Sequence, residues 1–272
     1  MYSIVTASLY TFLMTYPYLA SVSYVGTQYF GFQIQSTLPT IQGMIWQALR
    51  NLEPTIGLPA GASRTDAGVH ALDQKIFFRT ERVWDPVILR KAIQAYLPDD
   101  IQMNSVHTAA DLVFRKSVIA KHYSYRLSFG LKRNPLENFC RWHIPGSFQF
   151  DINHINEALK CFWGTHDFSS FRASECVAPS PLKTLYRFEI VEDDSGYRVH
   201  FYGNQFLMHQ VRILTGTLVE FIKNKLSAED LRIILAHKDR TQAGPTAPPH
   251  GLTLEKIWLD PATGLSEPFE IN

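Results

Sequence analysis

The stretch "KHYSYRLSF", residues 121–129, decides the fold because polar and apolar side chains alternate along it. A period of two is typical of a β-strand that buries one face. Tyr123 and Tyr125 fall on the same face, and two aromatic rings at this spacing usually belong to a core. The alternative is that one of the rings is a stacking platform for a nucleic-acid base. The stretch therefore predicts a strand and leaves the use of its tyrosines open.

Upstream of this strand, the sequence predicts further strands near residues 18–25, 74–80 and 101–107. Two helices are expected between them, one after Thr40 and one after Asp85, because each of these side chains can serve as an N-cap. The second helix is expected to turn the following side chains inward: Ile88, Leu89, Ala92, Ile93 and Tyr96.

Downstream of the strand, a similar mixture of elements recurs. The sequence predicts a helix capped by Asp151, a hairpin of strands 184–192 and 197–203 around "DDSG", a helix along 211–222, a helix that begins in a capping box of Ser227 and Asp230, and a strand over 252–259. This order predicts an α+β fold in which helices pack on a largely antiparallel sheet.

The chain is interpreted as three segments: an N-terminal extension over residues 1–17, an N-terminal half over 18–112 and a C-terminal half over 113–272. No Asp, Glu, Lys or Arg precedes Arg50, so the start lacks the positive charge of a secretory signal. Polar residues interrupt it too often for a membrane span. Residues 1–13 have no assigned role, and Met14 is an alternative start.

Composition bounds the class of protein. The chain has 272 residues, of which 46% are apolar and 19% charged, as in a folded globular protein. The formal net charge of +1 neither requires nor excludes a nucleic-acid partner, so local charge has to decide. The 3 cysteines contain no Cys-x-x-Cys pair, which argues against a disulfide framework or a cysteine zinc site. We expect a reducing, cytoplasmic location.

The loop "RTDAG", residues 64–68, sets Arg64 and Asp66 among small side chains. The simplest interpretation is an exposed turn in which Arg64 is the partner of Asp66. The functional hypothesis is that a carboxylate next to Arg64 stays ionised and is positioned as a nucleophile or base. Small neighbours would then let a bulky substrate approach. His70 lies nearby, and a histidine near the start of a strand is more often a structural residue than an acid or base.

Residues 113–143 form a basic run, with seven Lys or Arg against one acidic residue, Glu137. The seven are Arg115, Lys116, Lys121, Arg126, Lys132, Arg133 and Arg141. Such a run is usually a solvated face, but beside strand aromatics it also fits a phosphate-binding surface. The candidate RNA contacts are Arg115, Lys121, Arg126, Lys132 and Arg133.

The stretch "GNQFLMHQVRILTGTLVE", residues 203–220, places Arg212 directly after the inward-facing Val211. A charge close to an apolar seam needs a partner, and Asp66 is a candidate. The alternative is that Arg212 reaches solvent along the flank of the helix.

Seven stretches, in this order, resemble the tRNA pseudouridine synthase A family. They are "SYVGTQYFGFQIQ" (23–35), "TIQGMIWQAL" (40–49), "RTDAGVHA" (64–71), "KHYSYRL" (121–127), "GTHDFSSFRA" (164–173), "GNQFLMHQVRILTGTLVE" (203–220) and "AGPTAPPHGLTLEKI" (243–257). Ser63 departs from the family pattern, which usually has Gly at that position.

The resemblance implies two similar α+β halves whose sheets join into one, with the active cleft between them. It implies conversion of uridine to pseudouridine in tRNA, on the 3′ side of the anticodon stem-loop at nucleotides 38 to 40. It also implies a homodimer without a cofactor or metal. By motif position, Asp66 resembles the catalytic aspartate and Arg64 the arginine that displaces or holds the flipped base. Tyr123 resembles the tyrosine that packs against that base, and Arg212 the basic partner of the aspartate.

The chemistry agrees with these roles. Uridine isomerisation requires the base to leave the stack, detach at N1, turn and reattach through C5, so nothing is oxidised or consumed. The reaction needs a pocket for a flipped base, a stacking ring and a carboxylate that acts at the sugar, either by covalent or by proton-transfer chemistry.

Two other functions compete with this interpretation. A non-catalytic RNA-binding module would explain Tyr123 and the basic run, but not Arg64, Asp66 and Arg212 together. A hydrolase with Asp66 as nucleophile would explain the carboxylate, but it leaves the basic run unused and lacks a second carboxylate motif.

Overall fold

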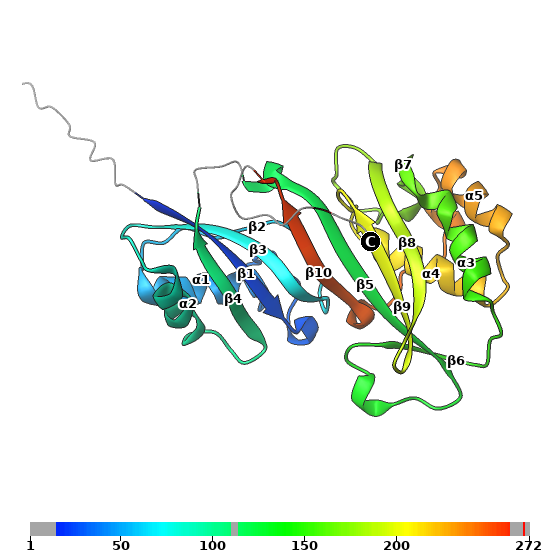
Figure 1. Ribbon diagram of the computed structural model, residues 1–272, viewed down its shortest axis with the longest axis horizontal. Helices are drawn as coiled ribbons and strands as arrows, with labels where there is room; N and C mark the ends of the chain where they lie inside the picture. Colours follow the sequence, from blue (N-terminus) through cyan, green and yellow to red (C-terminus); the bar gives the residue numbers. More distant parts are fainter. Residues whose placement is uncertain (1–14, 110–113, 262–268, 270–272) are drawn as a thin grey trace, which may run out of the picture.

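The computed structural model describes residues 15–109, 114–261 and 269, and one mixed sheet runs through the described part of the chain (Figure 1). Its strands are β1 Tyr16–Tyr24, β2 Ala60–Gly61, β3 His70–Thr80, β4 Ile101–Thr108, β5 Val118–Gly130, β6 Trp142–Pro145, β7 Gly164–Asp167, β8 Leu182–Asp193, β9 Gly196–Gly203 and β10 Leu252–Leu259. The α-helices are α1 Ile41–Leu52, α2 Pro86–Gln94, α3 Ile152–Leu159, α4 Gln210–Ile222 and α5 Ala228–His237. The α+β class expected from the sequence is confirmed.

The strand order explains how the two ends of the molecule are joined. The sheet runs β4-β1-β3-β10-β5-β9-β8-β7, with β2 attached to β3 and β6 to β5. Pairing is antiparallel except between β10 and β3 and between β5 and β6. The last strand, β10, therefore lies in the middle of the sheet, between β3 and β5, as the red strand in Figure 1 shows. Hydrogen bonding continues through it from the N-terminal to the C-terminal strands.

The helices gather at the two ends of this sheet (Figure 1). α1 and α2 contact each other, and α2 contacts β4, whereas α3 packs on β8 and α5 on β7. The predicted caps are present: Thr40 accepts from the Gly43 N–H, and Asp85 from Val87 and Ile88. Ser227 and Asp230 form the predicted capping box of α5. Local capping chemistry therefore set the starts of these helices.

The sequence predicted more buried side chains on α2 than the structure has. Leu89 and Ile93 are buried, but Ile88 is 59% exposed and Tyr96, just beyond the helix, is 51% exposed. The physical reason is that α2 packs against β4, which is an edge strand, so only a narrow stripe of the helix finds a partner.

The segment boundaries stay predictions. Residues 1–14 and the expected boundary between 112 and 113 lie outside the described residues, and β1 begins at Tyr16, inside the segment interpreted as an extension. No helix in the described ranges combines the length and apolar character that a membrane crossing requires.

Candidate active site

A cavity of about 630 Å³ brings the four principal candidates together. Arg64 and Asp66 reach it from the loop before β3, Tyr123 from β5, and Arg212 from the first turn of α4. Residues from distant parts of the sequence thus share one site, as the resemblance implied.

The loop that carries Asp66 is fixed from several sides. The side chain of Gln74 accepts from the Ser63 N–H at 3.1 Å and donates to the Ser63 carbonyl at 2.7 Å. The hydroxyls of Thr65 and Tyr24 are 2.8 Å apart, and the Thr65 carbonyl accepts from the Phe32 N–H at 3.0 Å. Because both residues that flank Arg64 are held in place, the interpretation of this loop as a simple exposed turn is wrong.

Gly31 explains why the segment before α1 can pack so closely against this loop. Its φ of +91° lies in the left-handed region, and a Cβ there would be 2.8 Å from the Thr65 carbonyl oxygen. A larger residue would clash and be strained, so the loop and this segment depend on glycine at this position.

Asp66 forms an ion pair with Arg212. The Arg212 Nη1 to Asp66 Oδ2 distance is 2.9 Å, and the two side chains are 14% and 24% exposed. The Arg212 Nε–H donates to the Ala247 carbonyl at 2.8 Å, so the guanidinium is held at two edges. The alternative of a solvent-reaching Arg212 is wrong, and the carboxylate has a fixed cationic partner.

The loop over residues 243–251 has a supporting role that its sequence did not reveal. Besides accepting from Arg212 Nε, Ala247 donates its N–H to the Arg212 carbonyl at 3.1 Å. Gly216 on α4 allows the approach, because a Cβ there would be 1.7 Å from the Pro245 carbonyl oxygen. The loop therefore orients Arg212 through backbone groups, which no side-chain pattern identifies.

His209 was missed by the sequence analysis. It precedes α4 with a left-handed φ of 61°, and its Nε2 lies 3.5 Å from Asp66 Oδ2. This backbone conformation is uncommon for a residue other than glycine. The stretch around His209 was noted only for its helical stripe and for Arg212, so nothing singled the histidine out.

Arg64 occupies a different place from the one the simplest interpretation gave it. It lines the cavity and is exposed, but among the described residues the ion-pair partner of Asp66 is Arg212, and His209 Nε2 lies 3.5 Å from the same carboxylate oxygen. Within the described residues, Arg64 therefore has no ion pair with the carboxylate two positions away. Its guanidinium is left available to something outside the chain.

Tyr123 and Tyr125 have separate roles although they share a strand face. Tyr125 is fully buried, and its hydroxyl donates to the Pro248 carbonyl at 2.6 Å, so it belongs to the core. Tyr123 is 6% exposed but lines the cavity, with its hydroxyl 2.8 Å from the Ser63 hydroxyl. Burial raises the pKa of Tyr123 to about 12, so its phenol stays protonated at neutral pH.

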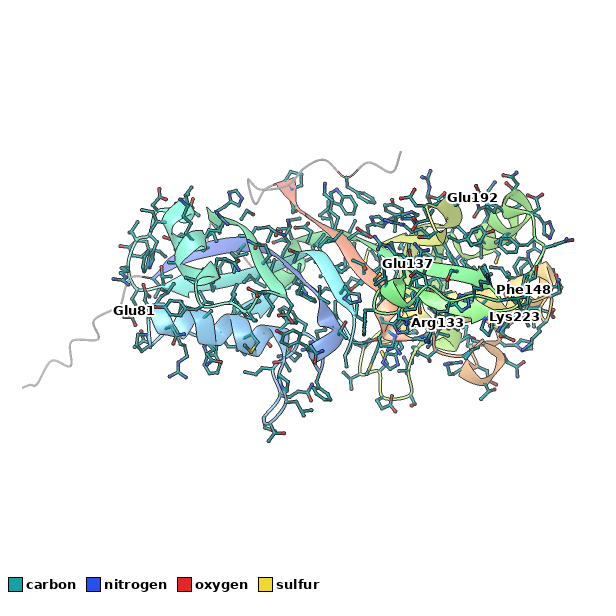
Figure 2. The ribbon with its side chains drawn as sticks, turned by 90° about the horizontal axis from the view of Figure 1, so that it is seen from below. Glu81, Arg133, Glu137, Phe148, Glu192 and Lys223 are labelled. Carbon is teal, nitrogen blue, oxygen red and sulfur yellow. The ribbon has the colours of Figure 1, made fainter. Side chains whose placement is uncertain are left out.

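The basic run does not form one surface. Lys121 lines the cavity, whereas Arg126 is partly buried and belongs to the opposite face of β5 by strand alternation. Lys132 and Arg133 are exposed on the segment after β5, where Figure 2 labels Arg133. The side chain of Arg115 lies outside the described residues. Lys121 and Arg126 therefore do not share one surface, and the candidate RNA contacts stay predictions.

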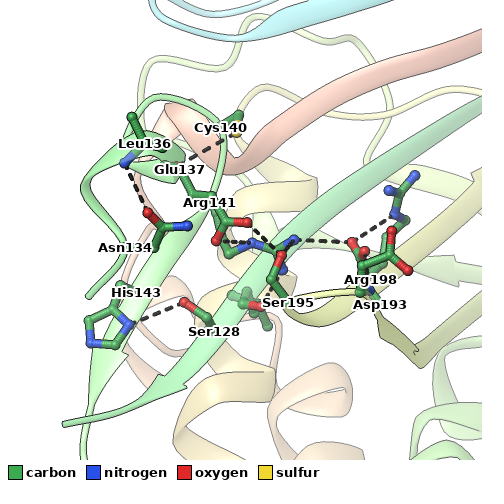
Figure 3. Close-up of polar contacts among 12 residues, drawn as sticks. Ser128, Asn134, Leu136, Glu137, Cys140, Arg141, His143, Asp193, Ser195 and Arg198 are labelled. Atoms are coloured by element: carbon green, nitrogen blue, oxygen red, sulfur yellow. Dashed lines mark hydrogen bonds and ion pairs between the residues drawn. The ribbon is translucent and has the colours of Figure 1, made fainter. Parts of the chain in front are cut away.

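Arg141, also part of the run, is a structural residue. Its side chain is 5% exposed and forms ion pairs with Glu137 and Asp193, at 3.2 and 3.3 Å (Figure 3). It also donates to the Leu127 carbonyl and to the Ser195 hydroxyl. Arg141 thereby ties the segment before β6 to the β8–β9 turn, and it is not placed to contact phosphate.

His70 is structural, as expected. Its Nδ1 accepts from the Gly26 N–H at 3.0 Å, which leaves Nε2 as the protonated nitrogen. Nε2 then donates toward the carbonyls of Phe139 and His250, at 2.9 and 3.1 Å. Burial lowers the pKa of His70, consistent with a neutral ring that clamps three segments of backbone.

Cys140, Cys161 and Cys176 are free thiols. In the part of the chain that the structure describes, no group of three or more His, Cys, Asp or Glu side chains is arranged to hold a metal ion.

Comparisons with known proteins agree with the geometry. The family model described as tRNA pseudouridine synthase matches residues 20–115 and 158–258. The curated tRNA pseudouridine synthase A of Geobacillus kaustophilus (strain HTA426) is 38% identical over 242 residues, which cover 88% of this chain and 93% of the relative. Its counterpart in Azorhizobium caulinodans is 36% identical over 245 residues, with the same coverage of 88% and 93%.

A solved structure, the "Crystal Structure of a Cbf5-Nop10-Gar1 Complex", is a more distant likeness. Its TM-score is 0.37 at 10% identity, and the aligned region covers 87% of this chain and 48% of that one. At this distance the likeness adds nothing to the assignment.

Proposed function

The chain belongs to the tRNA pseudouridine synthase family, and we propose that it isomerises uridine to pseudouridine on the 3′ side of the anticodon stem-loop, at nucleotides 38 to 40 of tRNA, with Asp66 as the catalytic carboxylate. The observation that carries the proposal is the position of Asp66. Its carboxylate lines a cavity large enough for a nucleotide, beside a partly buried arginine and an aromatic ring.

The balance of the reaction fits such a site. The bond between N1 and C1′ breaks, a bond between C5 and C1′ forms, the proton on C5 is lost and N1 ends protonated. No electrons leave the substrate. Asp66 acts at the sugar either as a nucleophile toward C1′ or as a base, and the 2.9 Å contact with Arg212 fixes the orientation that both roles require.

The other cavity residues receive roles from their positions. Arg64, exposed at the cavity and not paired with Asp66, displaces or holds the flipped base. Tyr123 offers its ring to the base while its hydroxyl is held by Ser63. Arg212 keeps Asp66 oriented. Lys132 and Arg133 are exposed outside the cavity, where they can meet phosphates of the tRNA.

The proposal includes a homodimer and a cytoplasmic location. Both were expected from the sequence, the first from the family resemblance and the second from the free cysteines. The mass of the purified chain in solution, measured by light scattering, tests the dimer.

The deciding experiment is to incubate the protein with unmodified tRNA and to map pseudouridine at single-nucleotide resolution. Pseudouridine confined to nucleotides 38 to 40 supports the proposal, and product at other positions contradicts the assigned target. Tight binding without product would indicate a non-catalytic RNA-binding module, and release of free base would indicate a hydrolase.

A further inference from the structure

Lys121 is a cation inside the cavity whose charge the protein leaves largely unmatched. It lines the same cavity as Asp66 and Tyr123, and its Nζ donates to the Ser63 hydroxyl at 3.1 Å. Among the described residues, no carboxylate lies within ion-pair distance of it, and Ser63 is its one hydrogen-bond acceptor. An ammonium has three N–H donors, so two remain for a ligand. Burial lowers its pKa to about 8, which leaves it mainly charged at neutral pH.

Ser63 fixes where this ammonium sits. The Ser63 backbone is clamped by Gln74, and its hydroxyl oxygen lies 3.1 Å from Lys121 Nζ and 2.8 Å from the Tyr123 hydroxyl. Lysine can only donate, so the serine oxygen accepts from Lys121 and shares its remaining capacity with Tyr123. The ammonium and the phenol thus contact the same serine oxygen, and all three groups belong to residues that line the cavity.

We propose that Lys121 binds the target nucleotide inside the cavity, by donating a hydrogen bond to a carbonyl oxygen of its uracil base. The inference rests on the proposed function and deepens it. A uracil edge presents two carbonyl acceptors, O2 and O4. Cytosine keeps O2 but has an amino donor in place of O4. A donor-only group that meets O4 would therefore reject cytosine, because two donors would face each other.

A phosphate is the weaker candidate for this lysine. The cavity already contains the Asp66 carboxylate, which would repel a second anion. Lys132 is exposed outside the cavity, where a backbone phosphate can reach it without entering the cavity.

The test compares Lys121→Met with Lys132→Met in the full chain. Both remove one ammonium from a lysine, one inside the cavity and one outside. Lys121→Met is expected to keep the melting temperature, the tRNA affinity and the salt dependence of binding, but to lower the single-turnover rate about 10- to 100-fold, as the loss of a hydrogen bond from a charged donor does. Lys132→Met is expected to weaken binding and to flatten its salt dependence, two effects that Lys121→Met should lack.

Base analogues then identify the acceptor. In tRNA whose target uridine carries sulfur at position 2 or position 4, one substitution is expected to slow the wild-type enzyme, because sulfur is the weaker acceptor. The same substitution should have no further effect on Lys121→Met. Ser63→Ala provides a second variant, which keeps the lysine but removes its acceptor. It is expected to lose about 2- to 10-fold in rate, and the sulfur substitution should have no further effect on it, as in Lys121→Met.

Three results would overturn the inference: wild-type rates from Lys121→Met, a loss of affinity with a flattened salt dependence in Lys121→Met, or thio penalties that persist unchanged in both variants. Absence of product from the wild-type chain would instead contradict the proposed function itself.

Discussion

The two faces of β5 place neighbouring residues in opposite environments. On one face, Lys121 and Tyr123 line the cavity and Tyr125 fills the core. On the other, His122 hydrogen-bonds His200 across the β5–β9 pair and stacks on Tyr202, with ring centroids 4.1 Å apart. The strand alternation assigns each residue to one face, and what packs on that face then decides its role. Residue type alone does not: Lys121 and Arg126 are both cations of one strand, but only Lys121 lies in the cavity.

The largest effect is expected from Asp66→Asn, which replaces the Asp66 carboxylate in the cavity by an uncharged amide of nearly the same shape. It should fold, bind tRNA as the wild type does, and lower the single-turnover rate of pseudouridine formation by at least about 1,000-fold. Asp66→Glu should also fail, because one added methylene moves the carboxylate away from its fixed position.

Single-turnover pseudouridine formation with excess enzyme measures this effect, alongside a tRNA-binding assay on the same preparations. Substantial product from Asp66→Asn would mean that the carboxylate is structural and that the catalytic group lies elsewhere.

Arg212→Met should have the next largest effect. It removes the guanidinium that holds Asp66 at 2.9 Å but retains an unbranched, uncharged stem. We expect a loss of about 100-fold in rate, because Asp66 would lose the cation that orients it and an ion pair in a partly enclosed site is screened less than one on the surface. Arg232→Met, which breaks an exposed pair between residues three apart on α5, is the control and should be silent in the same assay.

These cavity contacts mark the limit of what the sequence could predict. Capping residues, apolar stripes and alternation located the α-helices and the longer strands of the described residues, because these signals depend on neighbours within a few positions, but they did not reveal the short strands β2, β6 and β7. The pairing of Asp66 with Arg212 was inferred from a charge beside an apolar seam. In contrast, the contact of Ala247 with Arg212 is made by backbone atoms, and the approach of His209 depends on a left-handed φ. Neither leaves a signature in side-chain order.

The basic run failed as a surface for a related reason. Charge density along the sequence carries no information on which side chains find acids after folding, and Arg141 finds both Glu137 and Asp193. Asp193 is distant in sequence, at the β8–β9 turn.

Tyr123 separates stacking from hydrogen bonding. Tyr123→Ala removes the ring and should lower the rate about 10- to 100-fold, as loss of base–aromatic stacking does. Tyr123→Phe keeps the ring but loses the contact with Ser63, so a decrease of no more than about tenfold is expected. Single-turnover rates of the two variants make the comparison. Equal loss in both would give the hydroxyl a direct part in the chemistry, and full activity in both would remove Tyr123 from the site.

Cations outside the cavity should affect binding rather than rate. Lys132→Ala with Arg133→Ala should weaken tRNA binding several-fold and reduce the slope of log affinity against log salt by about 1 to 2, because each phosphate contact releases counterions. Titrations at several salt concentrations measure the slope. The matched control is Lys225→Ala, since Lys225 is exposed and pairs with Glu220 at the end of α4. An unchanged slope in the double variant would remove this segment from the RNA-binding surface.

The smallest effect concerns the face of β5 that carries His122, where we expect a change in stability and none in catalysis. Burial, followed by the neighbouring His200 and Arg198, lowers the pKa of His122 to about 3, and burial lowers that of His200 to about 4. An unfolded histidine titrates near pH 6.5. Below that pH the unfolded chain therefore binds protons that the folded chain cannot, so the free energy of unfolding falls as pH decreases from about 6.5 toward 4.

His122→Phe keeps a ring to stack on Tyr202 and abolishes the titration of His122. Between pH 6.5 and 4.5, the unfolding free energy of the variant should fall less steeply than that of the wild type. The two slopes should differ by about 1 kcal/mol per pH unit. Urea unfolding at a series of pH values measures the difference, and pseudouridine formation at pH 7.5 should be equal in both. Parallel pH dependences would mean that the histidine pair is protonated in the folded chain as readily as in the unfolded one, and reduced activity would connect this face of the strand to the cavity after all.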